Sequence, residues 1–166
     1  MVSCLLAIAL TFTTAMPLLA HPPLIQHVNP DFVPPPPNGA FSHIAVYNNV
    51  KDLVFVAGQR GRISCPENPG GCLVPLDVVN GLEGYSRVRQ AYQNMKDLAE
   101  SQGATLQDCA RIVVYVTDIR YRATANAIQE LPEFWGDGTK PPRTIVVVTG
   151  LNENDILEVE GTFARK

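Results

Sequence analysis

The chain has 166 residues, of which 46% are hydrophobic and 17% are charged, and this supplies enough apolar material for one compact domain. Its 13 basic residues are outnumbered by 16 acidic ones, so a formal charge of -3 leaves no cationic surplus with which to hold a polyanion. The composition therefore disfavours nucleic acid as a partner and favours a small molecule.

Residues 1–20 have the composition of a secretory signal peptide. They contain no Lys, Arg, Asp or Glu and are apolar from Leu5 to Ala20. The alternative, an uncleaved membrane anchor, is weaker because the apolar stretch is shorter than the ~20 residues of a spanning helix and Pro17 would interrupt it. We expect cleavage after Ala20, secretion or delivery to a secretory-pathway compartment, and no membrane association of the mature chain.

Residues 21–38 form a proline-rich N-terminal arm. Proline fixes φ and removes an amide donor, so the run Pro34–Pro37 is expected to be a stiff polyproline II segment. Such tracts usually connect other parts of a protein, so we interpret the arm as a spacer rather than as a docking site for a proline-reading module.

Three cysteines remain after loss of Cys4 with the signal. Cys65 and Cys72 flank a loop rich in turn residues whose ends can approach each other, and an oxidising compartment favours a disulfide between them. Zinc would need more ligands than these two, and no histidine lies nearby, so we expect no metal. Cys109 precedes an apolar strand and is interpreted as a buried core thiol rather than as a nucleophile.

The first predicted elements are a strand over Leu53–Gly58, which is an apolar run that ends in glycine, and a helix over Glu83–Gln102. The helix follows from apolar residues that recur at intervals of three and four: Val88, Ala91, Met95 and Leu98. Gly103 supplies its stop signal.

The C-terminal half predicts three strands and one helix. Ile112–Thr117 is rich in β-branched residues and apolar on both faces, which is typical of a strand in the middle of a sheet. Tyr121–Leu131 is predicted to be a helix that Pro132 ends or kinks. The last two strands, Arg143–Thr149 and Ile156–Phe163, are joined by a short polar turn.

This element order predicts an α+β fold in which two helices cover one face of a sheet. The strands are too apolar to leave the second face in water, so we expect a homo-oligomer that packs these faces together. The chain contains no P-loop, G-x-G-x-x-G or G-x-S-x-G motif, which removes the commonest nucleotide-binding and serine-hydrolase interpretations.

Three positions, Arg143, Glu158 and Glu160, carry candidate chemistry. Arg143 opens an apolar strand directly after two prolines, which suits a carboxylate clamp, although residue statistics alone favour a surface arginine at a strand end. Glu158 and Glu160 alternate with apolar residues and so project from one sheet face. They are either two solvated carboxylates or a general base with a structural neighbour. The short turn permits this strand to pair with the Arg143 strand, in a register that the sequence leaves open.

Seven segments together resemble the reactive intermediate deaminase (RidA/YjgF, RutC-like) family, in order, over residues 39–166. They are GAFSHIAVYNN (39–49), LVFVAGQ (53–59), RQAYQNMKDLAESQGATLQD (89–108), ARIVVYVTD (110–118), ANAIQ (125–129), PPRTIVVV (141–148) and ILEVEGTFARK (156–166). The arginine after proline, followed by the I-x-E-x-E-like strand, is the most specific part of the resemblance.

The resemblance implies a chorismate-mutase-like α+β fold, with a sheet of about six strands and two helices on one face. It also implies a homotrimer with active sites in the clefts between subunits. The implied reaction is enamine/imine deamination, in which 2-imino acids are hydrolysed to 2-oxo acids and ammonia. A protonated imine carbon is already electrophilic, so such an enzyme must only hold the carboxylate, place a water and move protons, without a cofactor.

Carried over position by position, the resemblance assigns Arg143 to the substrate carboxylate and Glu158 to the activation of water. Asn126, which by itself would be interpreted as a helix-face amide, lines the implied site, and the backbone of Gly58 contacts the ligand.

Three further positions of the implied pocket depart from the family pattern. Phe41 stands where the family commonly has tyrosine, Ala57 replaces a serine, and Ile145 replaces a cysteine or other small residue. The more apolar pocket suits a bulkier or less polar substrate. The lost hydroxyls and the export signal also favour an alternative, a small-molecule-binding or tailoring protein of the same family without deaminase turnover. Ribonuclease activity, sometimes attributed to the family, is disfavoured by the acidic balance.

Overall fold

The structure is a computed structural model and describes residues 25–34, 36 and 39–165. The expected signal peptide, residues 1–20, lies outside the described residues, as does part of the expected arm, including Pro35 and Pro37 of its proline run. No helix among the residues that the structure describes combines the length and hydropathy needed to cross a membrane.

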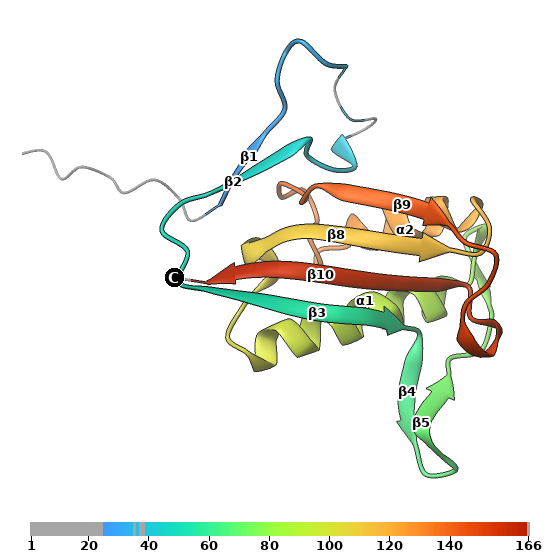
Figure 1. Cartoon of the computed structure of the whole chain (residues 1–166). Coiled ribbons are helices and arrows are strands. Elements are labelled where there is room, and N and C mark those ends of the chain that lie inside the picture. The colour runs from blue at the N-terminus through green and yellow to red at the C-terminus, as the bar shows by residue number, and fades with distance from the viewer. Residues whose placement is uncertain (1–24, 35, 37–38, 166) are drawn as a thin grey trace, which may run out of the picture.

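The fold consists of one larger sheet, three short hairpins and two helices (Figure 1). The strands of the larger sheet are β3 (Asp52–Arg60), β8 (Cys109–Val116), β9 (Arg143–Val147) and β10 (Leu157–Arg165). The hairpin strands are β1 (Ile25–Val28), β2 (Ile44–Tyr47), β4 (Arg62–Cys65), β5 (Asn68–Leu73), β6 (Val78–Val79) and β7 (Leu82–Glu83). The helices are α1 (Tyr85–Ser101) and α2 (Tyr121–Gln129).

The larger sheet has the order β3-β10-β8-β9, with β9 parallel to β8 and the other neighbours antiparallel. Both helices cover the same face of it (Figure 1). This confirms the α+β fold with two helices on one face. The sheet has four strands rather than about six, because the β1–β2 pair forms a ladder of its own that is not hydrogen-bonded to β3.

The helix-covered face holds the core. Alternate residues of β8 and β10 are almost fully buried under α1 and α2: Ile112, Val114, Val116, Leu157, Val159 and Phe163. From α1, Val88, Ala91 and Met95 pack against them, as the helix prediction expected. Leu98, the fourth predicted residue, is 45% exposed, and Ala99 is buried in its place. Gly103 has φ +73°, and its amide donates to the carbonyl of Glu100, so it ends α1 as predicted.

Two sequence-based expectations about the chain's connections need correction. The strand of Glu158 does not pair with the strand of Arg143, because β8 lies between β10 and β9 and pairs with both. In the N-terminal arm, Ile25–Val28 is more than a spacer, since it forms β1 and pairs with β2. The β-branched ends of this IQHV segment favour the strand, and the prolines around it concealed that signal.

The second face of the sheet carries large apolar side chains in solvent and is called the open face below. Phe55 is 73% exposed, Leu53 52% and Val146 38%. Val113, in the central strand, is buried even without a covering layer. The exposure agrees with the apolar second face that the sequence analysis inferred, and the homo-oligomer expected from it stays a prediction.

The disulfide predicted from the cysteine spacing is present. Cys65 and Cys72 are bonded across the β4–β5 hairpin with their Cα atoms 5.7 Å apart. The hairpin extends away from the sheet beyond the end of β3 (Figure 1). Among the described residues, the atoms of Cys65, Glu67 and Cys72 are close enough to hold a metal ion, but the bond occupies both sulfurs.

Thiol counting tests this cysteine pattern. Cys109 is free and buried, and burial raises the pKa of its thiol well above the ordinary value, so it should not react while the protein is folded. We expect the chain that begins at His21 to show no thiol reactive to Ellman's reagent when folded and one when unfolded without reductant. Three thiols in the unfolded protein would contradict the disulfide.

Candidate functional site

Arg143 is the first residue of β9, the edge strand of the larger sheet. It pairs with Ile112 of β8, which is fully buried beneath the helices, so the Arg143 side chain starts from the helix-covered face. The Arg143 guanidinium donates from Nη1 to Oε1 of Gln129, at the end of α2, over 2.5 Å. The chain therefore holds this arginine between its edge strand and its second helix.

A buried polar chain orients the guanidinium. Gln129 is 1% exposed, and its Nε2 donates to the hydroxyl of Tyr92, which is completely buried, over 3.2 Å. Burial raises the pKa of Tyr92 above its ordinary value, so this phenol is neutral. Burial also lowers the pKa of Arg143, and the nearby positive charge of Arg122 lowers it further. Because burial fixes the Tyr92 hydroxyl and the Gln129 amide, these groups hold the Arg143 guanidinium in one orientation.

Three other predicted site residues lie around Arg143. The Arg143 Cζ atom is 5.9 Å from the centre of the Phe41 ring, within cation–π range. Ile145 follows two residues later on β9 and packs against the core. Asn126 shares a face of α2 with Gln129, three residues on, and its buried Oδ1 has no hydrogen-bond partner among the described residues. We call Phe41, Asn126, Gln129, Arg143 and Ile145 the arginine half-site.

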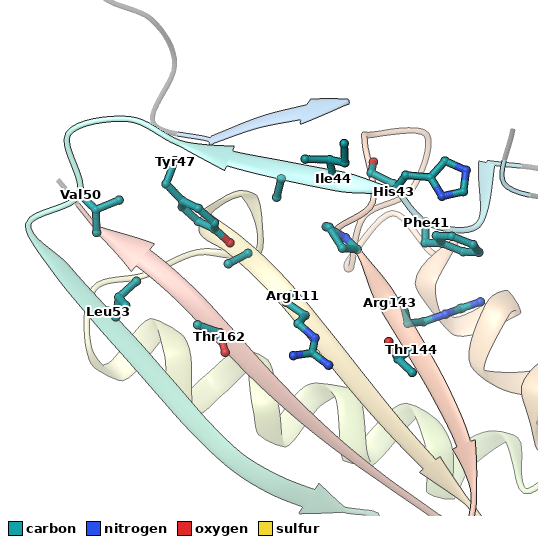
Figure 2. Close-up of a pocket in the computed structure, with 14 residues that line it drawn as sticks. Phe41, His43, Ile44, Tyr47, Val50, Leu53, Arg111, Arg143, Thr144 and Thr162 are labelled. Carbon is teal, nitrogen blue, oxygen red and sulfur yellow. The ribbon is translucent and has the colours of Figure 1, made fainter. Parts of the chain in front are cut away.

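Two cavities meet at the arginine half-site, and Phe41, Arg143 and Thr144 line both. The smaller one, of about 280 Å³, is completed by Ile119, Arg122 and Ile145. The larger one, of about 860 Å³, lies between the β1–β2 hairpin and the open face (Figure 2). In Figure 2, Arg143 and Phe41 lie together at one end of the larger cavity, and the guanidinium of Arg143 extends away from Arg111 and Thr162.

The remaining predicted residues gather elsewhere, where β3 pairs with β10, and we call Ala57, Gly58 and Glu158 the glutamate half-site. A Cβ atom at Gly58 would lie 1.9 Å from Oε1 of Glu158, so any larger residue at position 58 would displace this carboxyl group from its place. Arg60 lies opposite Glu158 in the β3–β10 ladder, with its Nε 3.8 Å from Oε2. Glu158 is thus held close to a glycine backbone while its side chain is still 29% exposed.

Tyr115 is the open-face neighbour of Glu158 on β8. Desolvation raises the pKa of the Tyr115 hydroxyl. The negative charge of Glu160, its hydrogen bond with this hydroxyl, and the negative charge of Glu158 raise the pKa further. A phenol therefore lies beside the two glutamates on the open face.

Within one chain the two half-sites do not meet. Tyr115, the partner of Glu158, points to the open face, whereas Ile112, the partner of Arg143, points to the helices. The Cα atoms of Glu158 and Arg143 lie two strand spacings apart and are offset by three residues along β8, which places them about 14 Å from each other. Their side chains start from opposite faces of the sheet. A crevice that contains both groups therefore requires at least two copies of the chain.

Two residues of this region escaped the sequence analysis. Gln129 is buried and bonded to Arg143, and Arg122 lines the smaller cavity. Arg122 and Gln129 lie four and three residues from Asn126, so all three share one face of the helix. The sequence shows this spacing, but the spacing identifies a site only when that face is known to pack against β9.

Comparison with known proteins places these features in a family. The model of a family described as "Endoribonuclease L-PSP" matches residues 33–164. The 2-iminobutanoate/2-iminopropanoate deaminase of Escherichia coli K12 is 29% identical over 115 residues, which cover 69% of this chain and 81% of that protein.

Two solved structures share the architecture. The YjgF gene product of E. coli has a TM-score of 0.56 at 27% identity, covering 72% of this chain and 85% of that one. The Rid family protein YyfB of Yersinia pestis has a TM-score of 0.69 at 21% identity, covering 86% of this chain and 99% of that one.

Proposed function

Because this chain belongs to the RidA/YjgF family, whose model matches residues 33–164, we propose that it is an enamine/imine deaminase-like hydrolase. Its substrates are 2-imino acids, which it converts to 2-oxo acids and ammonia. The relative named as a 2-iminobutanoate/2-iminopropanoate deaminase supports this reaction class.

The observation that carries the proposal is the presence of two complementary half-sites on one chain. The arginine half-site offers a fixed guanidinium for a carboxylate, and the glutamate half-site offers a carboxyl group packed against Gly58. Since the two lie on opposite faces, the active site is formed where the arginine half-site of one copy meets the glutamate half-site of the next. A homotrimer closes this head-to-tail contact, and the apolar open face supplies its interface.

In the proposed mechanism, Arg143 binds the substrate carboxylate through two parallel hydrogen bonds, which fixes the position of the imine carbon. Glu158 of the neighbouring copy accepts a proton from a water molecule as the water oxygen adds to that carbon. Addition of water makes the carbon–nitrogen bond single, and Glu158 then returns the proton to the nitrogen. The nitrogen leaves as ammonia while the new hydroxyl group loses its proton and becomes the carbonyl oxygen. The family resemblance also assigns Asn126 to the site, and its buried Oδ1 has no hydrogen-bond partner in the described part of the chain.

A coupled assay tests the proposal. An amino-acid oxidase generates 2-iminobutanoate in place, and the release of 2-oxobutanoate or ammonia is followed with and without the protein. We expect the protein to accelerate release above the rate of spontaneous hydrolysis. Catalase and a heat-denatured sample of the protein control for peroxide and for general base catalysis.

One result would favour the alternative function. Phe41 and Ala57 leave the site without two hydroxyl groups that the family commonly has. A folded trimer that gives no acceleration would therefore support a protein that binds or tailors a small molecule. The ribonuclease named in the description of the family model receives no support from the acidic balance of this chain.

A further inference from the structure

Arg122 is a second guanidinium at the cavity that Arg143 lines. It lies in the first turn of α2, and with Arg143, Phe41, Ile119, Thr144 and Ile145 it encloses about 280 Å³. None of these six residues carries a carboxyl group. The cavity is therefore cationic, although the chain as a whole carries a formal charge of -3.

The two arginines raise each other's electrostatic energy. Burial and the positive charge of Arg122 lower the pKa of Arg143, while its interaction with Tyr92 raises it. Two like charges that face one partly desolvated space are destabilising unless an anion lies between them. An anionic ligand would remove that repulsion.

Two other arginines of the helix layer, Arg120 and Arg89, are paired with carboxylates of the chain. Arg120, two residues before Arg122 on the same turn, lies 3.2 Å from Glu83 and 3.4 Å from Asp118. Arg89 is paired with Glu133 at 3.1 Å. Among the described residues, Arg122 forms no ion pair and no side-chain hydrogen bond. Arg122 is exposed, and its guanidinium is free to pair with a ligand in the cavity.

We propose that the preferred substrates are 2-imino dicarboxylic acids, in which Arg143 holds the carboxylate next to the imine and Arg122 holds the carboxylate of the side chain. The inference rests on the proposed function and names its substrate class. The reaction is unchanged: water supplies the oxygen of the new carbonyl group, and the imine nitrogen leaves as ammonia. Phe41 and Ile145 pack against the methylene groups between the two acids.

The test compares two substrates on the same protein. Imines of L-glutamate and of L-2-aminobutyrate are generated by oxidases, and the ratio of their kcat/KM values is the readout. We expect the ratio to favour the dicarboxylate at least tenfold in the wild type. Arg122→Gln should lower that ratio about tenfold, whereas Arg122→Lys, which keeps the charge, should retain most of it. Arg120→Gln is the matched control on the same helical turn and should leave the ratio unchanged.

The outcomes separate this inference from the proposed function. The inference is wrong if the protein hydrolyses the 2-aminobutyrate imine and shows no preference for the dicarboxylate. It is also wrong if Arg122→Gln leaves the kcat/KM ratio unchanged. In both cases the proposed function still stands. If neither imine is hydrolysed, the proposed function is wrong, and calorimetric titration with 2-oxoglutarate and 2-oxobutanoate decides the inference. Binding of 2-oxoglutarate that is tighter and weakened by Arg122→Gln would support it, and equal or absent binding would overturn it.

Discussion

Arg143→Ala should lower kcat/KM for 2-iminobutanoate hydrolysis about 100-fold, because two charge-assisted hydrogen bonds together contribute about 3 kcal/mol. The loss should appear mainly in KM, since the guanidinium binds a carboxylate that does not change during the reaction. The buried Gln129 would also lose the donor to its Oε1. The measurement is the coupled assay over a range of oxidase-generated imine concentrations.

Arg143→Lys is the matched control for this variant. It keeps the positive charge but loses the planar fork that binds a carboxylate through two bonds, so we expect a loss between those of wild type and Arg143→Ala. Circular dichroism and size-exclusion chromatography must show that both variants remain folded and assembled. Wild-type KM in folded Arg143→Ala would contradict the role given to the guanidinium.

Glu158→Gln should lower kcat roughly 1,000-fold while KM changes by less than about threefold, because a positioned general base contributes 10²–10⁴ to the rate and the amide cannot accept the proton. Glutamine is similar in shape to glutamate, so it should still fit against Gly58. The measurement is kcat at saturating imine in the same coupled assay.

Glu160→Gln provides the control on the same strand. Glu160 lies two residues further along β10 on the same open face, but it pairs with Val113 instead of Tyr115. It interacts with the Tyr115 hydroxyl and is not part of the glutamate half-site. Activity within a few-fold of wild type is therefore expected. Equal losses in both variants would indicate a general effect of negative charge on this face rather than a specific base at position 158.

The sequence predicted the four strands of the larger sheet and both α-helices, but not the hairpin strands β1, β2 and β4–β7. The periodicity of α1, the run Ile112–Thr117 and the alternation of Leu157–Glu160 depend on local patterns that burial imposes directly, and each was confirmed with boundaries shifted by a few residues. Helix α2 ends at Gln129, two residues before the predicted end, because Pro132 restricts the chain ahead of it.

The sequence did not predict the order in which the strands pair. A short turn between Val147 and Leu157 favoured a hairpin, yet β8 separates β9 from β10 and β9 runs parallel to β8. The pairing of strands that are distant in the chain depends on how the whole fold packs, and a local sequence pattern does not predict it. For the same reason, the opposite directions of Arg143 and Glu158 became visible only from their partners on β8.

The character of the pocket was only partly predictable. Phe41, Ala57 and Ile145 suggested a more apolar site, and the structure places Phe41 and Ile145 beside Arg143. The helical spacing alone could not show that Arg122 faces the same cavity, because an exposed arginine in the first turn of a helix is common. With Arg122, the site is apolar in its walls and cationic at two points.

Complementation between two inactive variants tests most directly whether the active site is shared between copies. Arg143→Ala and Glu158→Gln chains with different affinity tags are co-expressed, and mixed assemblies are purified through both tags and counted by native mass spectrometry. If each site takes Arg143 from one copy and Glu158 from the next, random mixing leaves about a quarter of the sites intact, so the unfractionated mixture should recover about a quarter of wild-type activity. Mixed trimers no more active than the two separate variants would contradict the account.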